Sequence, residues 1–161
     1  MSKSELRKLM ESELPSISFQ KKRLYKTNKK EVMRLYNLLN KEIFGNKLPI
    51  AKITLLSKLP NMWGKCQAAG YPYSDKSVCE ITVGTNWFCI QWLIMTLAHE
   101  MSHQYQWEVL GKQRIKKGKD PIMSHGPSFY TLRDKMNKKG IPLKKILHTN
   151  IWFEKQNLLK C

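Results

Sequence analysis

One segment restricts the possible folds of this chain more than any other: residues 87 to about 110, which predict a long helix that is apolar on two opposite sides. Asn86 is placed to cap this helix, and Gly111 to follow its last turn. Trp92 and Met95 lie towards one side. The other side carries apolar residues at helical spacing, namely Ile90, Ile94, Leu97, Met101 and Tyr105. Such a helix is expected at the centre of the molecule, with one face on the core and the other lining a cleft.

The cleft side of this helix carries His99-Glu100-Met101-Ser102-His103. Residues four apart lie one turn apart on the same face of a helix, so both imidazoles can reach one metal ion at about 2.0 to 2.1 Å. Glu100 lies beside them, where it can act on a water molecule instead of binding the metal. The alternative is a helix with two unrelated histidines, and the spacing inside a predicted helix favours the metal site.

A catalytic zinc site needs three protein ligands and one open position, so one ligand remains to be found. Glu108 is near in sequence but points to the opposite side of the helix. His125 is the better candidate, because it comes just before a predicted helix whose Phe129 can anchor in the core. Zinc also accepts carboxylates, and the other candidates are Asp120, His148 and Glu154.

Two further helices are predicted with clear boundaries. Residues 29–44 show helical spacing of apolar side chains after Asn28, which forms an N-cap pair with Glu31. Pro127 suits the first turn of another helix, which Gly140 ends. Its inward residues are predicted to be Phe129, Leu132 and Met136.

Three β-prone runs lie between these helices, at residues 53–56, 65–69 and 78–83. The simplest arrangement is a small three-stranded antiparallel sheet, formed as a meander and packed against the central helix and its flanking helices. The predicted fold class is therefore α+β. A chain of 161 residues with 42% hydrophobic content is long enough for one compact domain.

We assign residues 27–161 to this domain and residues 1–26 to a basic amino-terminal arm. Residues 4–14 of the arm predict a short helix with Leu6, Leu9 and Met10 on one side, stopped by Pro15. Residues 141–161 alternate apolar and polar side chains without indicating an element.

The composition indicates a cytoplasmic protein with a polyanionic partner. The charged start lacks the apolar region of a secretory signal, and the most apolar stretch is too short to cross a bilayer. The chain carries 29 Lys and Arg against 12 Asp and Glu, a formal net charge of +17. Nucleic acid is the commonest partner for such an excess, although a solvated surface is the alternative.

Four cysteines without a C-x-x-C pair indicate reduced thiols. A bridge between Cys66 and Cys79 stays open, because the two residues can lie on neighbouring strands.

Two motifs together resemble the SprT-like metalloproteases, the group that includes the Spartan DNA–protein crosslink proteases. They are the H-E-x-x-H sequence with His125-Gly126-Pro127-Ser128-Phe129 downstream, and the earlier segment from Asn40 to Pro49. The resemblance covers roughly residues 29–139. It implies a zincin-like fold in which His99, His103 and His125 bind zinc and Glu100 is the general base.

The resemblance also implies protein substrates that are bound or crosslinked to DNA, each held as an extended strand along an edge of the sheet. Family members often carry a zinc ribbon after the protease domain, whereas only a short tail with Cys161 follows here. Contacts to DNA phosphates would then fall to the basic ends and to the cations between His103 and His125. These are Lys112, Arg114, Lys116, Lys117 and Lys119.

We expect a monomer without membrane contact. Two alternatives are a non-catalytic, zinc-containing DNA-binding protein and a cytosolic metalloprotease unrelated to DNA.

Overall fold

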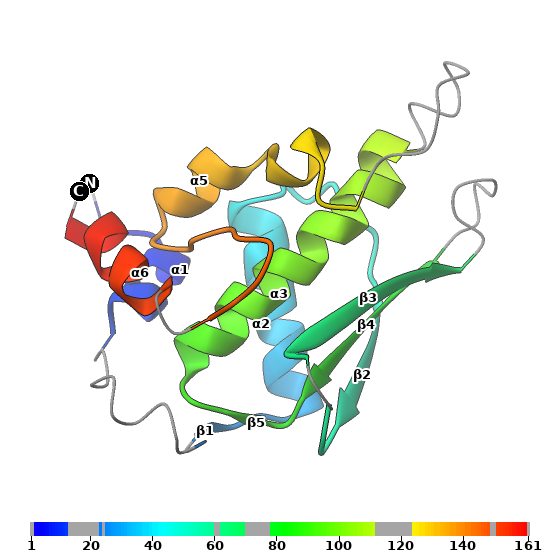
Figure 1. The fold of residues 1–161 in the computed structure, drawn as a ribbon, viewed down its shortest axis with the longest axis horizontal. Coiled ribbons are helices and arrows are strands. Elements are labelled where there is room, and N and C mark those ends of the chain that lie inside the picture. Colours follow the sequence, from blue (N-terminus) through cyan, green and yellow to red (C-terminus); the bar gives the residue numbers. More distant parts are fainter. Residues whose placement is uncertain are drawn as a thin grey trace.

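A computed structural model describes residues 2–12, 23, 25–59, 62–69, 78–111, 124–148 and 151–160. The fold is α+β, as predicted. Helix α3 (Ile90–Tyr105) runs through the middle, with a three-stranded sheet on one side and the carboxy-terminal helices on the other (Figure 1). All of its residues except Ile90 and His99 are buried. The prediction of a central helix with apolar sides is therefore confirmed.

The three predicted strands exist, but their arrangement differs from a meander. Strands β2 (Lys52–Leu56), β3 (Gly64–Ala69) and β4 (Val78–Gly84) form a sheet of order β2-β4-β3. Strand β4 pairs parallel with β2 and antiparallel with β3, so the predicted antiparallel sheet is wrong. Strand β4 is the central strand and is paired on both sides. Its alternate residues Cys79, Ile81 and Val83 are fully buried, as expected for a strand at the centre of a sheet.

A second pair of strands changes where α3 begins. Strand β1 (Tyr25–Lys26) pairs antiparallel with β5 (Asn86–Trp87). Asn86 therefore belongs to a strand, and the N-cap of α3 is Cys89. The predicted cap at Asn86 is wrong because its backbone is already paired with that of Lys26.

Helix α2 (Lys29–Glu42) begins as predicted, since the Asn28 side chain accepts a hydrogen bond from the backbone N–H of Glu31. After the helix, Gly45 and Asn46 both adopt positive φ, at 61° and 59°. The Asn40 side chain then bonds both the N–H and the C=O of Leu48. This contact closes the turn that carries the Asn40–Pro49 motif.

Helix α1 (Glu5–Glu11) belongs to the core, although the sequence analysis assigned its residues to an arm. Leu6 and Met10 are fully buried. The Arg7 guanidinium donates to the backbone oxygens of Lys138 and Leu159, so α1 contacts the carboxy-terminal part of the chain.

The sequence analysis assigned no element to the last residues, where the structure forms α6 (Ile151–Lys160). Helix α6 lies beside α1 (Figure 1). The ammonium of Lys155 is fully buried between them and donates to the Met10 carbonyl at 2.6 Å. Burial lowers the pKa of Lys155 to about 8.

The predicted helix from Pro127 to Gly140 is divided into a 3₁₀ turn, η3 (Pro127–Tyr130), and a short α5 (Arg133–Asn137). Phe129 and Met136 are buried as predicted, while Leu132 is partly buried. Helix α3 itself continues into a π-helical turn, η2 (Gln106–Gly111). No helix in the described part of the chain has the length and hydropathy needed to cross a bilayer.

Cys66 on β3 and Cys79 on β4 lie on neighbouring strands, and both are free thiols. A hydrogen bond with Cys79 and burial raise the pKa of the Cys66 thiol. Cys161 lies outside the described residues.

The docking of α6 can be tested at Gly140, which has a φ of 79° and whose added Cβ would collide with the Leu159 side chain. Gly140→Ala should lower the free energy of unfolding by about 2 to 3 kcal/mol, because it combines backbone strain with overpacking. Gly45→Ala is the matched control, since Gly45 has a φ of 61° but nothing within 4 Å of an added Cβ. It should cost only about 1 kcal/mol. Denaturant unfolding measures both, and equal losses would show that Leu159 does not pack there.

Candidate metal centre

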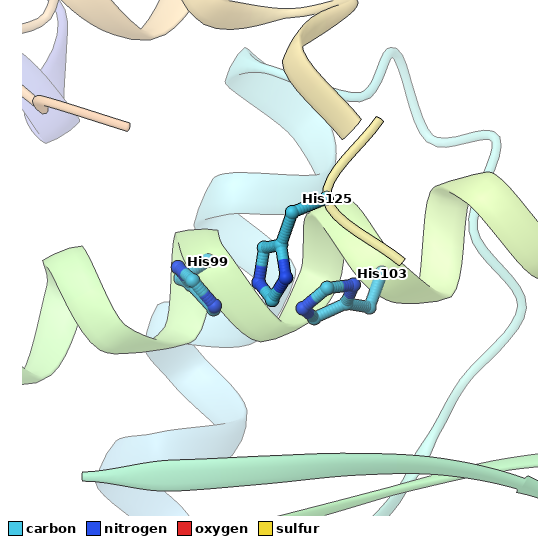
Figure 2. Close-up of side chains that lie close together, drawn as sticks. All are labelled: His99, His103 and His125. Carbon is cyan, nitrogen blue, oxygen red and sulfur yellow. The ribbon is translucent and has the colours of Figure 1, made fainter. Parts of the chain in front are cut away.

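Three histidines from two separate segments meet above the middle of α3. His99 and His103 project from the helix, and His125 approaches from the segment that precedes η3 (Figure 2). One ring nitrogen of each lies within 4.8 Å of those of the other two. The structure thus brings together the three residues that the sequence singled out, in a group that could hold a metal ion.

Phe129 explains how His125 reaches the helix. Pro127 and Phe129 form the 3₁₀ turn directly after the histidine. The Phe129 ring is buried, and its centroid lies 4.7 to 4.9 Å from those of all three imidazoles. Burial of this apolar ring holds the preceding residue over α3.

Hydrogen bonds orient the two helical histidines. The Nδ1 of His99 lies 2.8 Å from the Lys144 carbonyl oxygen, and the Nδ1 of His103 lies 3.0 Å from Oε1 of Gln106. Both partners only accept, so each Nδ1 carries the proton and donates it. The Nε2 atoms are left unprotonated, which is the state that a metal ligand requires.

His125 provides an independent test of fit. Its Nε2 is buried and has no hydrogen-bond partner among the described residues. A buried polar atom without a partner is costly, and a metal ion shared with the other two imidazoles would satisfy it. The donor set therefore fits a divalent metal ion.

The protonation states agree with this arrangement. Burial lowers the pKa of His99 and of His103 to about 4, and burial also lowers the pKa of His125. At pH 7 the three imidazoles are therefore neutral. Metal binding would not have to displace protons from them.

Glu100 occupies a different kind of environment. It is buried, and burial raises its pKa to about 8. A Cβ added at Gly64, the first residue of β3, would lie 3.2 Å from Cγ of Glu100 and 2.9 Å from Cγ2 of Thr96. The absence of a side chain at Gly64 lets the strand approach the carboxyl group. Glu100 and His99 both line a cavity of about 420 Å³.

The other candidate ligands lie elsewhere or outside the described residues. Glu108 accepts a hydrogen bond from the Cys79 N–H, and Glu154 forms an ion pair with Lys144. His148 is exposed and does not belong to the histidine group. Asp120 falls outside the described residues.

Sequence reasoning did not identify the residues that support the ligands. Gln106 follows His103 by three residues on the same helical face, so its spacing could have indicated the contact. Its Nε2 donates to Oγ of Ser128 and so links α3 to the turn that carries Phe129. Nothing in the sequence could have indicated the Lys144 carbonyl, 45 residues from His99.

No protein-family model matches this chain, and a search of curated proteins found no match either.

The metal centre can be tested by substituting single histidines. His125→Ala should reduce the occupancy of a divalent metal strongly, because it removes one of three ligands. His148→Ala is the control, since this histidine is exposed and lies outside the group. Elemental analysis after dialysis measures metal per chain. Equal occupancy in the two variants would exclude His125 as a ligand.

Proposed function

We propose that this chain is a zinc-dependent endopeptidase of the SprT-like type, with His99, His103 and His125 as metal ligands and Glu100 as general base. One observation carries the proposal: three neutral imidazoles converge beside a buried carboxyl group that is not part of their group. This combination supports hydrolysis, because it separates metal binding from proton transfer.

The donor set favours zinc in a catalytic role. Three imidazole nitrogens suit zinc, which has no geometric preference of its own and accepts tetrahedral coordination. Structural zinc sites are closed by four protein ligands. Three ligands among the described residues leave a position for water or substrate, as in catalytic sites.

When bound, zinc would supply Lewis-acid chemistry, polarising the scissile carbonyl and lowering the pKa of water. Glu100 then accepts the proton of the attacking water and later delivers it to the leaving amine. A nearby dication would stabilise the carboxylate and so lower a pKa that burial alone raises to about 8. With a metal bound, burial and the dication would act on the pKa of Glu100 in opposite directions, and a general base is most effective when its pKa lies near the operating pH.

Strand β3 supports a binding mode for the substrate. It lies at an edge of the sheet, pairs only with β4 among the described residues, and contacts α3. Its first residue, Gly64, lies against Glu100. An extended peptide added to this edge would have its backbone directed past the metal centre. Binding through main-chain hydrogen bonds tolerates many peptide sequences.

The charge supports DNA as the partner that supplies selectivity. A net charge of +17 favours retention on a polyanion, so proteins bound or crosslinked to DNA would be the substrates that the enzyme meets. The cations proposed to contact DNA, Lys112 to Lys119, lie outside the described residues. The contacts would involve phosphates without reading the bases.

Two other functions make different predictions. A non-catalytic DNA-binding protein would bind metal and DNA but cleave nothing. A metalloprotease unrelated to DNA would cleave proteins at a rate that DNA leaves unchanged.

The decisive experiment compares the parent chain with Glu100→Gln on a DNA-binding protein substrate. Gln keeps the size and polarity of Glu100 but cannot accept a proton, so hydrolysis should fall by about 10² or more while zinc stays bound. The parent should be stimulated by single-stranded DNA and inactivated by a chelator. Cleavage by Glu100→Gln at a near-normal rate would remove Glu100 from the mechanism, and cleavage indifferent to DNA would favour the plain protease.

The DNA contact is tested separately by changing the five cations between the ligands to Ser. These are Lys112, Arg114, Lys116, Lys117 and Lys119. The variant should bind DNA more weakly and with a flatter dependence on salt, because fewer counterions are released. Zinc content and folding should be retained. Unchanged affinity and slope in a filter-binding titration would exclude this segment as the contact.

A further inference from the structure

The cavity beside the metal centre lies to one side of it. It has a volume of about 420 Å³ and includes His99 and Glu100 but neither His103 nor His125 in its wall. Gly64 also lines it, so the cavity adjoins the start of the edge strand β3. A peptide extended along β3 would therefore place one side chain, next to the bond that is cleaved, at the mouth of this cavity.

Two cations line this cavity. The guanidinium carbon of Arg23 lies 4.9 Å from the centroid of the Trp63 ring. This cation–π contact holds the Arg23 guanidinium in place. Lys145 lies near enough to the metal centre to contribute to the lowered pKa of His125. The ion pairs among the described residues involve other lysines and arginines. Within the part of the chain that the structure describes, Arg23 and Lys145 therefore have no ion-pair partner.

The cavity wall provides too few acids to balance them. Among the described residues that line it, Glu100 is the only acid, so the two cations outnumber it whatever its protonation state. A metal ion on the three histidines would add further positive charge. The electrostatic potential in the cavity is therefore positive, and partial enclosure strengthens its effect on a bound anion.

The remaining walls are apolar. The exposed fractions of Met62 and Ile146 are 47% and 66%, which is high for large hydrophobic residues. The other apolar residues that line the cavity are Leu59, Trp63 and Leu147. A ligand that suits such walls has an aliphatic stem and a negatively charged end. Asp and Glu side chains have this combination, whereas Lys and Arg would bring like charges together.

We propose that this cavity is a specificity subsite for an acidic side chain of the peptide substrate, whose carboxylate is bound by Arg23 and Lys145. This inference rests on the proposed peptidase function. A nucleic acid phosphate shares the negative charge but lacks the aliphatic stem, and a continuous phosphate backbone is normally bound along an open surface. The apolar walls and the position beside β3 favour the peptide.

The test uses the full chain loaded with zinc and two matched sets of peptides. One residue on each side of the scissile bond is varied among Glu, Gln, Leu and Lys. At the peptide position whose side chain enters the cavity, kcat/KM should be about tenfold higher for Glu than for its neutral isostere Gln, and lowest for Lys. The preference should shrink as salt rises. Equal rates for Glu and Gln on both sides would overturn the subsite.

Charge reversal identifies the residues responsible. Lys145→Glu should abolish the preference for Glu and improve cleavage of the Lys peptide, and Arg23→Gln should weaken the preference. Lys135→Glu is the matched control, since it makes the same charge change at an exposed position that does not line the cavity. An equal loss of preference in Lys135→Glu would attribute it to the overall charge and contradict the proposal.

A binding measurement separates this inference from the proposed function. Calorimetric titration of zinc-loaded Glu100→Gln should show tighter binding of the Glu peptide than of the Gln peptide, whether or not the parent cleaves either one. Cleavage of peptides without such a difference would refute the subsite and leave the peptidase standing. Selective binding without any cleavage by the parent would refute the peptidase. Displacement of the Glu peptide by a short oligonucleotide, with the effect lost in Lys145→Glu, would assign the cavity to nucleic acid and overturn the proposal.

Discussion

Burial of α3 on nearly every side is the constraint on which the rest of the structure depends. All residues of this helix except Ile90 and His99 are buried, so neighbouring elements have to cover it from several directions. The sheet covers one side, while α2 and the segments after residue 124 cover others (Figure 1). Because the helix cannot shift without disturbing all of these contacts, the side chains of His99, Glu100 and His103 are held in the same frame.

The metal centre is correspondingly a meeting point of distant segments. The Lys144 carbonyl orients His99, while Gln106 orients His103 and is itself bound to Ser128. Phe129 packs against all three imidazoles. Such supporting contacts determine which ring nitrogen is free for a metal. The geometry of the candidate centre therefore depends on the surrounding core residues as well as on the three histidines.

Burial also shifts the pKa values of the imidazoles and of Glu100 in opposite directions. The same loss of solvent keeps the imidazoles neutral and raises the pKa of Glu100 to about 8. A cavity that carries Arg23 and Lys145 opens beside this carboxyl group. A buried carboxyl group thus lies next to a cavity lined by two cations, and under the proposed peptidase function this combination suits a peptide whose scissile bond is flanked by an acidic residue.

The sequence by itself determined what depends on near neighbours. The period of apolar residues located α3, the Asn28 cap started α2, and the spacing of His99 and His103 put both on one helical face. Only the tertiary structure decided the parallel pairing of β2 with β4, the position of α1 in the core and the presence of helix α6. It also decided that the Lys144 carbonyl and the cations of the cavity wall lie near His99. The physical reason is the range of the interactions. Helix periodicity and capping act over three or four residues, whereas strand order and site geometry follow from how segments far apart in the chain share one core.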